Sequence, residues 1–145
     1  MNRIPFISSL LFLGACNSIT SEESPRKIDQ PCGDKPNCIS SQDKRDKFNS
    51  LPIRIKKTVS IKDIKKELLE MPGSTLIEQD PSYLRFTFTS RILRFIDDFE
   101  VKVEGNTLHV RSESRTGYSD FGVNKKRVED LRLRLKNANM LESIN

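Results

Sequence analysis

The sequence predicts an α+β fold: a small antiparallel sheet of about four strands, two helices packed on one face, and a disulfide-pinned extended segment before them. Two runs in which apolar residues alternate with polar ones, within 83–89 and 99–104, predict strands. Two segments with apolar residues three and four positions apart, 61–68 and 128–138, predict amphipathic helices.

The composition limits the class of protein. The chain has 145 residues, of which 35% are hydrophobic and 31% are charged, with 25 Lys and Arg against 20 Asp and Glu. This excludes a multi-spanning membrane protein, a collagen and a coiled coil. The length allows one modest domain, and the low apolar content predicts a thin core on one face of the sheet.

Residues 1–15 resemble a short secretory signal, in which Arg3 precedes an apolar stretch and small residues follow. The stretch is too short to span a bilayer, which takes about 20 apolar residues. Its end, Leu13-Gly14-Ala15-Cys16, resembles the lipobox of bacterial lipoproteins, in which the cysteine is acylated and the signal is cut before it. We therefore expect lipidation of Cys16 and a membrane as its partner. The alternatives are a secreted protein with a free Cys16 or a cytosolic chain with an apolar start.

The residues after the lipobox bear on location and domain limits. Asn17, rather than Asp, follows the cysteine; by resemblance to enterobacterial sorting this favours the outer membrane of the bacterial cell envelope, facing the periplasm. Residues 16–30 are polar and have no apolar period, so we expect a flexible tether there. A single α+β domain is expected over 31–139, with a short tail over 140–145.

Two cysteines remain once Cys16 is assigned to lipid. An exported chain meets disulfide-forming conditions, and the glycine and proline between Cys32 and Cys38 suit a tight loop, so we expect a disulfide. The alternative is a metal or redox pair. Thiolate metal sites normally need four ligands, and the chain has 1 His, His109. We expect no metal and no cofactor.

The first helix and first two strands have clear sequence signals. Ser60 can cap a helix with Asp63 three positions on, and the segment Met71-Pro72-Gly73 ends it. Strands are expected at 74–80 and 83–89, joined by a turn at 80–82. The expected inner face of the helix consists of Ile61, Ile64 and Leu68.

The hairpin that follows is the clearest element, because Gly105-Asn106 forms a two-residue turn between alternating runs. Such a turn fixes the register, which pairs Val101 with Val110 and Glu100 with Arg111. One face of the hairpin is then aliphatic, and the other is an ion-pair ladder that we expect to face solvent. His109 lies on this polar face and is expected to be a solvated surface histidine.

A closing helix is expected after the loop at 116–123, with Asn124 as its N-cap. Its inner face is expected to consist of Val128, Leu131, Leu135 and Ala138.

Two polar clusters lie beside the last strands. Asp97 and Asp98 point to opposite faces of a strand, so they cannot bind one ligand together. We expect one of them on the core side, opposite Ser114, where a buried carboxylate would need a guanidinium such as Arg91 or Arg115.

The first turn of the closing helix carries Lys125, Lys126 and Arg127, where the helix dipole disfavours cations. The compensating anion is either Asp120 with one of the strand carboxylates, or a phosphate or carboxylate ligand held at the helix start by Arg115 and Lys125. The candidate binding residues are Arg91, Asp97, Asp98, Ser114, Arg115, Tyr118, Ser119, Asp120, Asn124, Lys125 and Arg127.

Three stretches carry a family resemblance. They are Cys32-x-x-x-Pro36-Asn37-Cys38-Ile39-Ser40-Ser41, then Phe95-x-Asp97-Asp98-x-Glu100, then Val110-Arg111-Ser112-x-Ser114-Arg115-x-Gly117-Tyr118-Ser119-Asp120-x-Gly122-Val123-Asn124-x-x-Arg127. In this order and spacing they resemble the domain of unknown function 1499 family over about residues 32–135. Ile39 and Phe99 stand where Val is usual, and Lys126 where Arg is common. The resemblance implies a domain without an established reaction or ligand, found in plastids and in bacteria, often as exported or membrane-attached proteins.

We expect a non-enzymatic, lipid-anchored protein that binds an envelope protein or an anionic ligand through residues 115–127. Nucleic acid is not an expected partner, because no aromatic residues are interleaved with the basic ones and the chain is exported. The alternative is a hydrolase or transferase that uses Ser119 or Tyr118 with Asp120 and Arg115, although it lacks a neighbouring base. A third hypothesis is that the loop residues only stabilise the fold.

Overall fold

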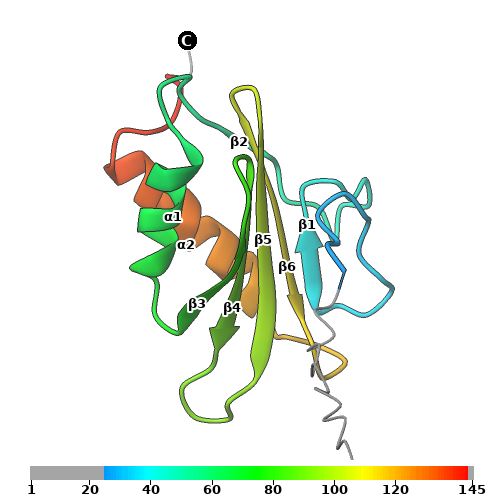
Figure 1. Ribbon diagram of the computed structural model, residues 1–145. Helices are drawn as coiled ribbons and strands as arrows, with labels where there is room; N and C mark the ends of the chain where they lie inside the picture. The colour runs from blue at the N-terminus through cyan, green and yellow to red at the C-terminus, as the bar shows by residue number, and fades with distance from the viewer. Residues whose placement is uncertain (1–24, 144–145) are drawn as a thin grey trace, which may run out of the picture.

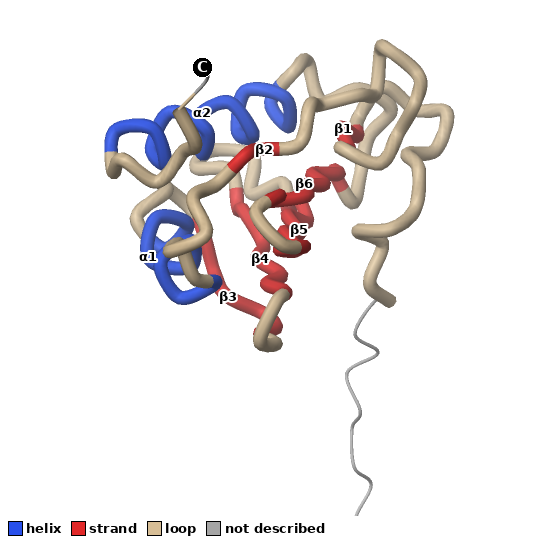
Figure 2. Tube along the Cα trace, turned by 90° about the horizontal axis from the view of Figure 1, so that it is seen from above, coloured by secondary structure: helices blue, strands red, loops and turns tan. Residues whose placement is uncertain are grey.

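The computed structural model describes residues 25–143, so the expected signal, Cys16 and most of the expected tether lie outside the described residues. Within that range, a six-stranded antiparallel sheet has the order β1-β6-β5-β4-β3, with β2 also paired to β6. Both helices cover the same face of the sheet (Figures 1 and 2). The elements are β1 (Cys38–Ser40), β2 (Ile53–Arg54), α1 (Ile61–Leu69), β3 (Ser74–Gln79), β4 (Tyr83–Thr89), β5 (Ile96–Glu104), β6 (Thr107–Ser114) and α2 (Val123–Asn137).

The predicted hairpin register is confirmed. Val101 pairs with Val110 and Glu100 with Arg111 across β5 and β6, on either side of the Gly105-Asn106 turn. The four expected strands are present as β3 to β6. β1 and β2, which are three and two residues long, add to the outer side of β6 and are too short to show a sequence period.

The face under the helices is apolar and contains the main core. Phe86, Phe99 and Val101 lie fully buried on it, and α1 and α2 pack on top. Ser60 caps α1 as predicted, since its hydroxyl accepts from the Asp63 N–H while the Asp63 carboxylate accepts from the Ser60 N–H. The helix residues in this core include Ile64, Leu68, Val128, Leu131 and Leu135.

The start of β3 depends on a glycine. Gly73 has a φ of 79°, and a Cβ at this position would lie 2.6 Å from the Thr89 carbonyl oxygen. The left-handed conformation and the close approach of β4 both exclude a side chain, so this glycine fixes the entry of the chain into β3.

The start of α2 differs from the prediction. The helix begins at Val123, and its N-cap is Gly122, with a φ of 82°, rather than Asn124. The capping carboxylate comes from Asp120, which leaves the Asn124 side chain free to turn into the core, where it is fully buried. Ala138, predicted on the inner face, is the C-cap and is exposed, because the helix ends at Asn137, two residues after Leu135.

The opposite face of the sheet is covered, which corrects two expectations. The tether was expected to run to residue 30, but Ile28 is buried and the N–H groups of Lys27 and Ile28 donate to the Glu100 carboxylate. The ladder expected to face solvent is therefore buried in its centre, at Glu100 and Arg111. A backbone segment satisfies these charges where water was expected to do so.

The predicted disulfide between Cys32 and Cys38 is confirmed, and it forms a second, small apolar cluster with Phe48. The neighbouring Asp43 carboxylate accepts from the Cys32 N–H at 2.8 Å and pairs with Arg45 at 2.7 Å. The Arg45 hydrogen bond holds the pKa of the Asp43 carboxyl well below its usual range.

None of the helices in residues 25–143 is long and apolar enough to cross a membrane.

Candidate functional site

The predicted binding residues gather at one end of the sheet, where β5 begins, β6 ends and α2 starts (Figure 1). The loop between β6 and α2, residues 115–122, closes this end. We describe the site from the strand carboxylates outward to the surface of this loop.

Asp97 lies on the core side of β5, opposite Ser114 as the register predicts. Its carboxylate pairs with Arg127 at 2.8 Å, and both side chains are mostly buried. The expected partner was Arg91 or Arg115, so that prediction is wrong. α2 docks across the end of the sheet and brings Arg127 over the Phe88 ring, with 4.6 Å between the guanidinium carbon and the ring centroid.

Asn124 joins three segments of the chain. Its Nδ2 donates to the Asn37 carbonyl oxygen and to the Ser114 hydroxyl, both at 3.0 Å. Its Oδ1 accepts from Arg127 at 2.8 Å and from the Ser112 hydroxyl. Because all of these groups are satisfied within the protein, this buried cluster fixes the position of the α2 start relative to β6 and the disulfide segment.

Asp98 points to the other face of the sheet, as predicted, and pairs with Arg115. The Arg115 guanidinium makes two hydrogen bonds to the carboxylate, at 2.9 and 2.7 Å, and these raise the pKa of Arg115 above its usual value. The two adjacent carboxylates thus hold two different arginines, one at the start of the loop and one after it.

Asp120 supplies the anion at the start of α2. Its two carboxylate oxygens accept from the N–H groups of Gly122 and Asn124, each at 2.9 Å. Of the two sequence hypotheses for the compensating anion, the structure has the internal one, with Asp120 at the helix start and Asp97 on Arg127. Arg115 is paired with Asp98, and the N–H groups at the start of α2 are bonded to Asp120. An external anion would therefore find neither the helix start nor the Arg115 guanidinium available.

The tip of the loop presents aromatic side chains to solvent. Tyr118 is 71% exposed and Phe121 is 95% exposed. Phe121 has a φ of 53°, in the left-handed region that a residue with a large side chain rarely adopts. Its N–H donates to the Ser119 hydroxyl at 3.2 Å, and the Asp120 cap follows directly. The polar network therefore holds an exposed phenylalanine in a strained conformation.

A pocket of about 240 Å³ lies between this loop and the disulfide segment. Two lysines, Lys47 and Lys125, contribute to its lining and are both exposed. The other lining residues are Pro36, Cys38, Ile39, Ser119, Asp120 and Gly122.

The sequence profile of the family described as "Protein of unknown function (DUF1499)" matches residues 30–135. The chain belongs to this family. No curated protein and no solved structure matches the chain. The buried network described above is built from the three stretches that carried the resemblance, since Asn37, Asp97, Ser112, Ser114, Asn124 and Arg127 all come from them.

One predicted site residue of this DUF1499 domain lies apart from the others. Arg91 is exposed in the loop between β4 and β5 and takes no part in the Asn124 cluster. Sequence reasoning in turn missed Asn37, Ser112 and Lys47. The alternation along β6 places Ser112 on the core side with Ser114, which was a usable signal, whereas Lys47 is brought near α2 only by the disulfide segment.

His109 is not the solvated residue that was expected. Its side chain is largely buried on the polar face, with Nδ1 3.3 Å from the Ser41 hydroxyl and Nε2 3.4 Å from Glu104. It lies next to the β5–β6 turn, at the opposite end of β6 from Ser119. Across residues 25–143 no group of three His, Cys, Asp or Glu side chains is placed to hold a metal ion.

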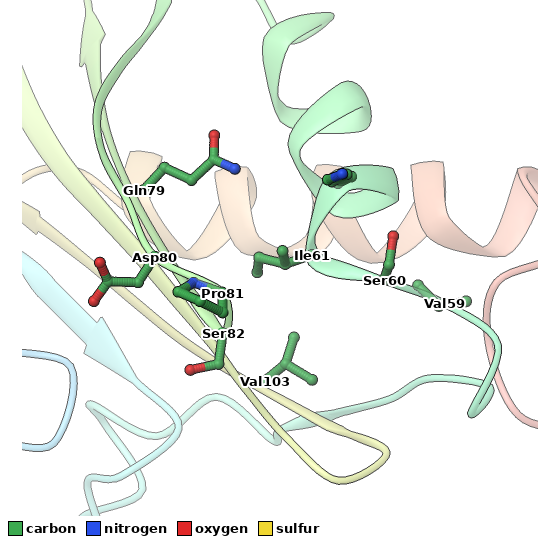
Figure 3. Close-up of a pocket in the computed structure, with 9 residues that line it drawn as sticks. Val59, Ser60, Ile61, Gln79, Asp80, Pro81, Ser82 and Val103 are labelled. Atoms are coloured by element: carbon green, nitrogen blue, oxygen red, sulfur yellow. The ribbon is translucent and has the colours of Figure 1, made fainter.

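A second, open pocket of about 1040 Å³ lies at that opposite end of the sheet (Figure 3). It is formed by the start of α1, the β3–β4 turn and β5, and its apolar lining comes from Val59, Ile61, Pro81 and Val103. None of the predicted binding residues reaches it.

Proposed function

We propose that the protein is a lipid-anchored protein of the bacterial cell envelope, attached through acylated Cys16, whose DUF1499 domain is a non-enzymatic binding module. Its partner is an acidic envelope protein that contacts the β6–α2 loop. The anchor is supported by the lipobox and by the short apolar stretch before it. The expected location is the periplasmic side of the outer membrane.

The observation that carries the binding role is the presentation of Phe121. A phenylalanine that is 95% exposed gains nothing from the core, and a left-handed backbone at this residue costs about 1–2 kcal/mol. Strained and exposed residues that the surrounding structure holds in place are typical of recognition sites. The buried Asn124 cluster and the Asp120 cap supply that support.

The charges beside Phe121 favour an acidic partner. Lys47 and Lys125 line the adjoining 240 Å³ pocket, and neither forms an ion pair with another described residue. Arg115 and Arg127, by contrast, are already held by Asp98 and Asp97. An aromatic contact at Phe121 together with acidic groups at the two lysines matches the composition of specific protein interfaces.

The binding role is tested with the lipidated full chain and a Phe121→Gly variant. Glycine accepts the left-handed conformation, so the free energy of unfolding is expected to stay unchanged or to rise by up to about 1 kcal/mol. Capture of an envelope protein by affinity pull-down and cross-linking is expected to fall by about tenfold.

The matched control is Leu133→Gly, which removes an apolar side chain that is 56% exposed on α2, away from the loop. It is expected to lower stability, since glycine is a poor helix former, and to leave capture unchanged. Equal capture by the parent chain, Phe121→Gly and a Lys125→Glu variant would overturn the binding role.

The anchor is tested separately. Intact mass measurement of the protein purified from its native membrane is expected to show loss of residues 1–15 and addition of acyl groups. Incorporation of labelled palmitate is expected to disappear in a Cys16→Ala variant. An uncleaved, unlipidated chain would disprove the anchor and leave the loop experiment standing.

The hydrolase or transferase alternative has no supporting contact in the described part of the chain. The Ser119 hydroxyl makes its hydrogen bond with the Phe121 N–H, and the Asp120 carboxylate is used by the helix start. We expect no labelling of Ser119 by an activity-based serine probe, and labelling would restore this alternative.

A further inference from the structure

We propose that the β4–β5 tip, residues 91–96, contacts the anionic surface of the membrane that holds the Cys16 lipid. The inference rests on the proposed function only through the anchor. It assigns a contact surface to Arg91, the candidate residue that the Asn124 cluster does not include.

The tip exposes an unusual amount of apolar surface. Ile92 is 87% exposed, Leu93 is 67% exposed and Phe95 is 53% exposed, and Ile96 at the start of β5 is also exposed. None of them contributes to either apolar core cluster. Contiguous exposed apolar residues of this kind are typical of sites that bind a membrane or another protein.

The charge of the tip favours anionic headgroups. Arg91 and Arg94 are both exposed, and neither pairs with a carboxylate within residues 25–143. Residues 90–96 contain no acidic side chain, and the next ones, Asp97 and Asp98, are neutralised by Arg127 and Arg115. Apolar side chains flanked by cations, without acidic residues among them, are typical of segments that lie in the interface of a bilayer.

The backbone holds these side chains outward. The Ser90 N–H donates to the Phe95 carbonyl oxygen at 2.8 Å, and the Phe95 N–H donates to the Ser90 hydroxyl at 2.8 Å. Arg94 has a φ of 55°, which turns the chain sharply inside this closed loop. The tip is therefore a defined projection at the end of the β4–β5 hairpin (Figure 1).

The length of chain before the domain places the tip within reach of the membrane. The link from Cys16 to residue 25 extends by no more than about 30 Å. The domain takes up the chain at Lys27, whose N–H bonds to Glu100, four residues along β5 from Ile96 and so about 13 Å from it. Acyl chains in the bilayer and side chains of the tip can thus occupy the same membrane together.

The test uses tryptophan as a depth probe, because the chain has no Trp. The lipidated full chain carrying Phe95→Trp is placed in phosphatidylcholine vesicles that contain phosphatidylglycerol and brominated lipids. Leu133→Trp is the matched control, with 56% exposure at the parent residue against 53% at Phe95. We expect a blue-shifted emission for Phe95→Trp and quenching at least about threefold stronger than for Leu133→Trp.

A second comparison tests the arginines. Adding Arg91→Gln and Arg94→Gln to Phe95→Trp, or replacing phosphatidylglycerol by phosphatidylcholine, is expected to reduce the quenching to that of the control. Equal quenching of the two probes would overturn the membrane contact. This holds even if an envelope protein is found cross-linked to the tip, since the tip would then bind protein and not lipid. Quenching that does not change when the anionic lipid is removed or when both arginines are replaced would overturn the assignment to anionic headgroups.

The inference and the anchor fail in distinguishable ways. The mature chain with Cys16→Ser lacks the acylated residue, and its Phe95→Trp form is expected to be quenched by the anionic vesicles more weakly but still more than its Leu133→Trp form. If mass measurement disproves the anchor while this difference persists, the tip contact stands alone. If the anchor is confirmed and the difference is absent, only the tip contact is wrong.

Discussion

The two faces of the sheet are both covered, but by different chemistry. The face under α1 and α2 buries apolar side chains, whereas the face under residues 26–32 buries the charges of Arg85, Glu100 and Arg111. Glu100 accepts from two backbone N–H groups and from the Tyr83 hydroxyl. Burial, followed by the charge of Glu100, raises the pKa of Tyr83 well above its usual value. The first face is stabilised by the burial of apolar surface. The second is stabilised by the hydrogen bonds and ion pairs that its buried charges make.

The difference determines how each face should respond to damage. Loss of an apolar side chain removes packing throughout a shared core, so the whole domain loses stability. Loss of one charged partner leaves specific donors unsatisfied, so the segment that supplied them should separate first.

The largest effect is expected on the apolar face. Phe99→Ala removes a fully buried ring that packs edge-on against Phe88, with 5.5 Å between the ring centroids. The free energy of unfolding is expected to fall by about 3–5 kcal/mol. Urea denaturation followed by circular dichroism measures this, and amide exchange should accelerate in both helices. A loss under about 1 kcal/mol would show that the core is not continuous.

Glu100→Ala is expected to cost about 2–3 kcal/mol, because it leaves the N–H groups of Lys27 and Ile28 and the Tyr83 hydroxyl without their acceptor. Hydrogen exchange should increase at residues 26–30 while α1 stays protected. Glu104→Ala, at the exposed end of the same face, is the control and should change stability little. Uniform exchange across the domain would contradict the separation of the two faces.

The disulfide stabilises the segment on the polar side. Replacing Cys32 and Cys38 by serine is expected to cost about 2 kcal/mol, since the closed loop is short. Proteolysis should then cut between residues 31 and 48 before it cuts the long strands β3 to β6. First cleavage within β4 or β5 would show that the bond supports the whole fold.

The smallest effect is expected from acid. The lowered pKa of Asp43 means that its carboxylate stabilises the folded state above the unfolded pKa of about 4, and that this contribution is lost as pH falls through the folded value. Unfolding free energies measured between pH 5 and 2 should fall less steeply for Asp43→Asn than for the parent chain. The difference is small because Arg45 is 41% exposed and water screens the pair. Parallel slopes would contradict it.

The apolar face was predictable because its signals are local. Alternation over β4 to β6, the Gly105-Asn106 turn and the Ser60 cap each lie within a few residues of the element that they specify. The cover on the polar face was not predictable. Residues 26–32 contain one buried aliphatic residue, Ile28, and bind the sheet through backbone N–H groups, which leave no period in the sequence.

The candidate site was predictable in part for the same reason. The hairpin register gave the pairing of Asp97 with Ser114 correctly. The partner of Asp97 depends on how α2 docks across the sheet, which sequence spacing does not determine. A strand carboxylate was therefore expected to compensate the cations of the first turn of α2, but the guanidinium on Asp97 is that of Arg127 and not of Arg91 or Arg115. Asn124 was assigned to the cap from its residue type, although Asp120 performs that role and Asn124 is buried.

The path of residues 26–32 across the strands also sets how the domain bears mechanical load. A pull on the chain before residue 25 acts first on Arg26, which is ion-paired to Glu78 and Asp80, and then on the two amides held by Glu100. Beyond them the Cys32–Cys38 bond closes the segment covalently. Tension would therefore detach residues 26–32 from the sheet one contact at a time and leave the helices and their core undisturbed.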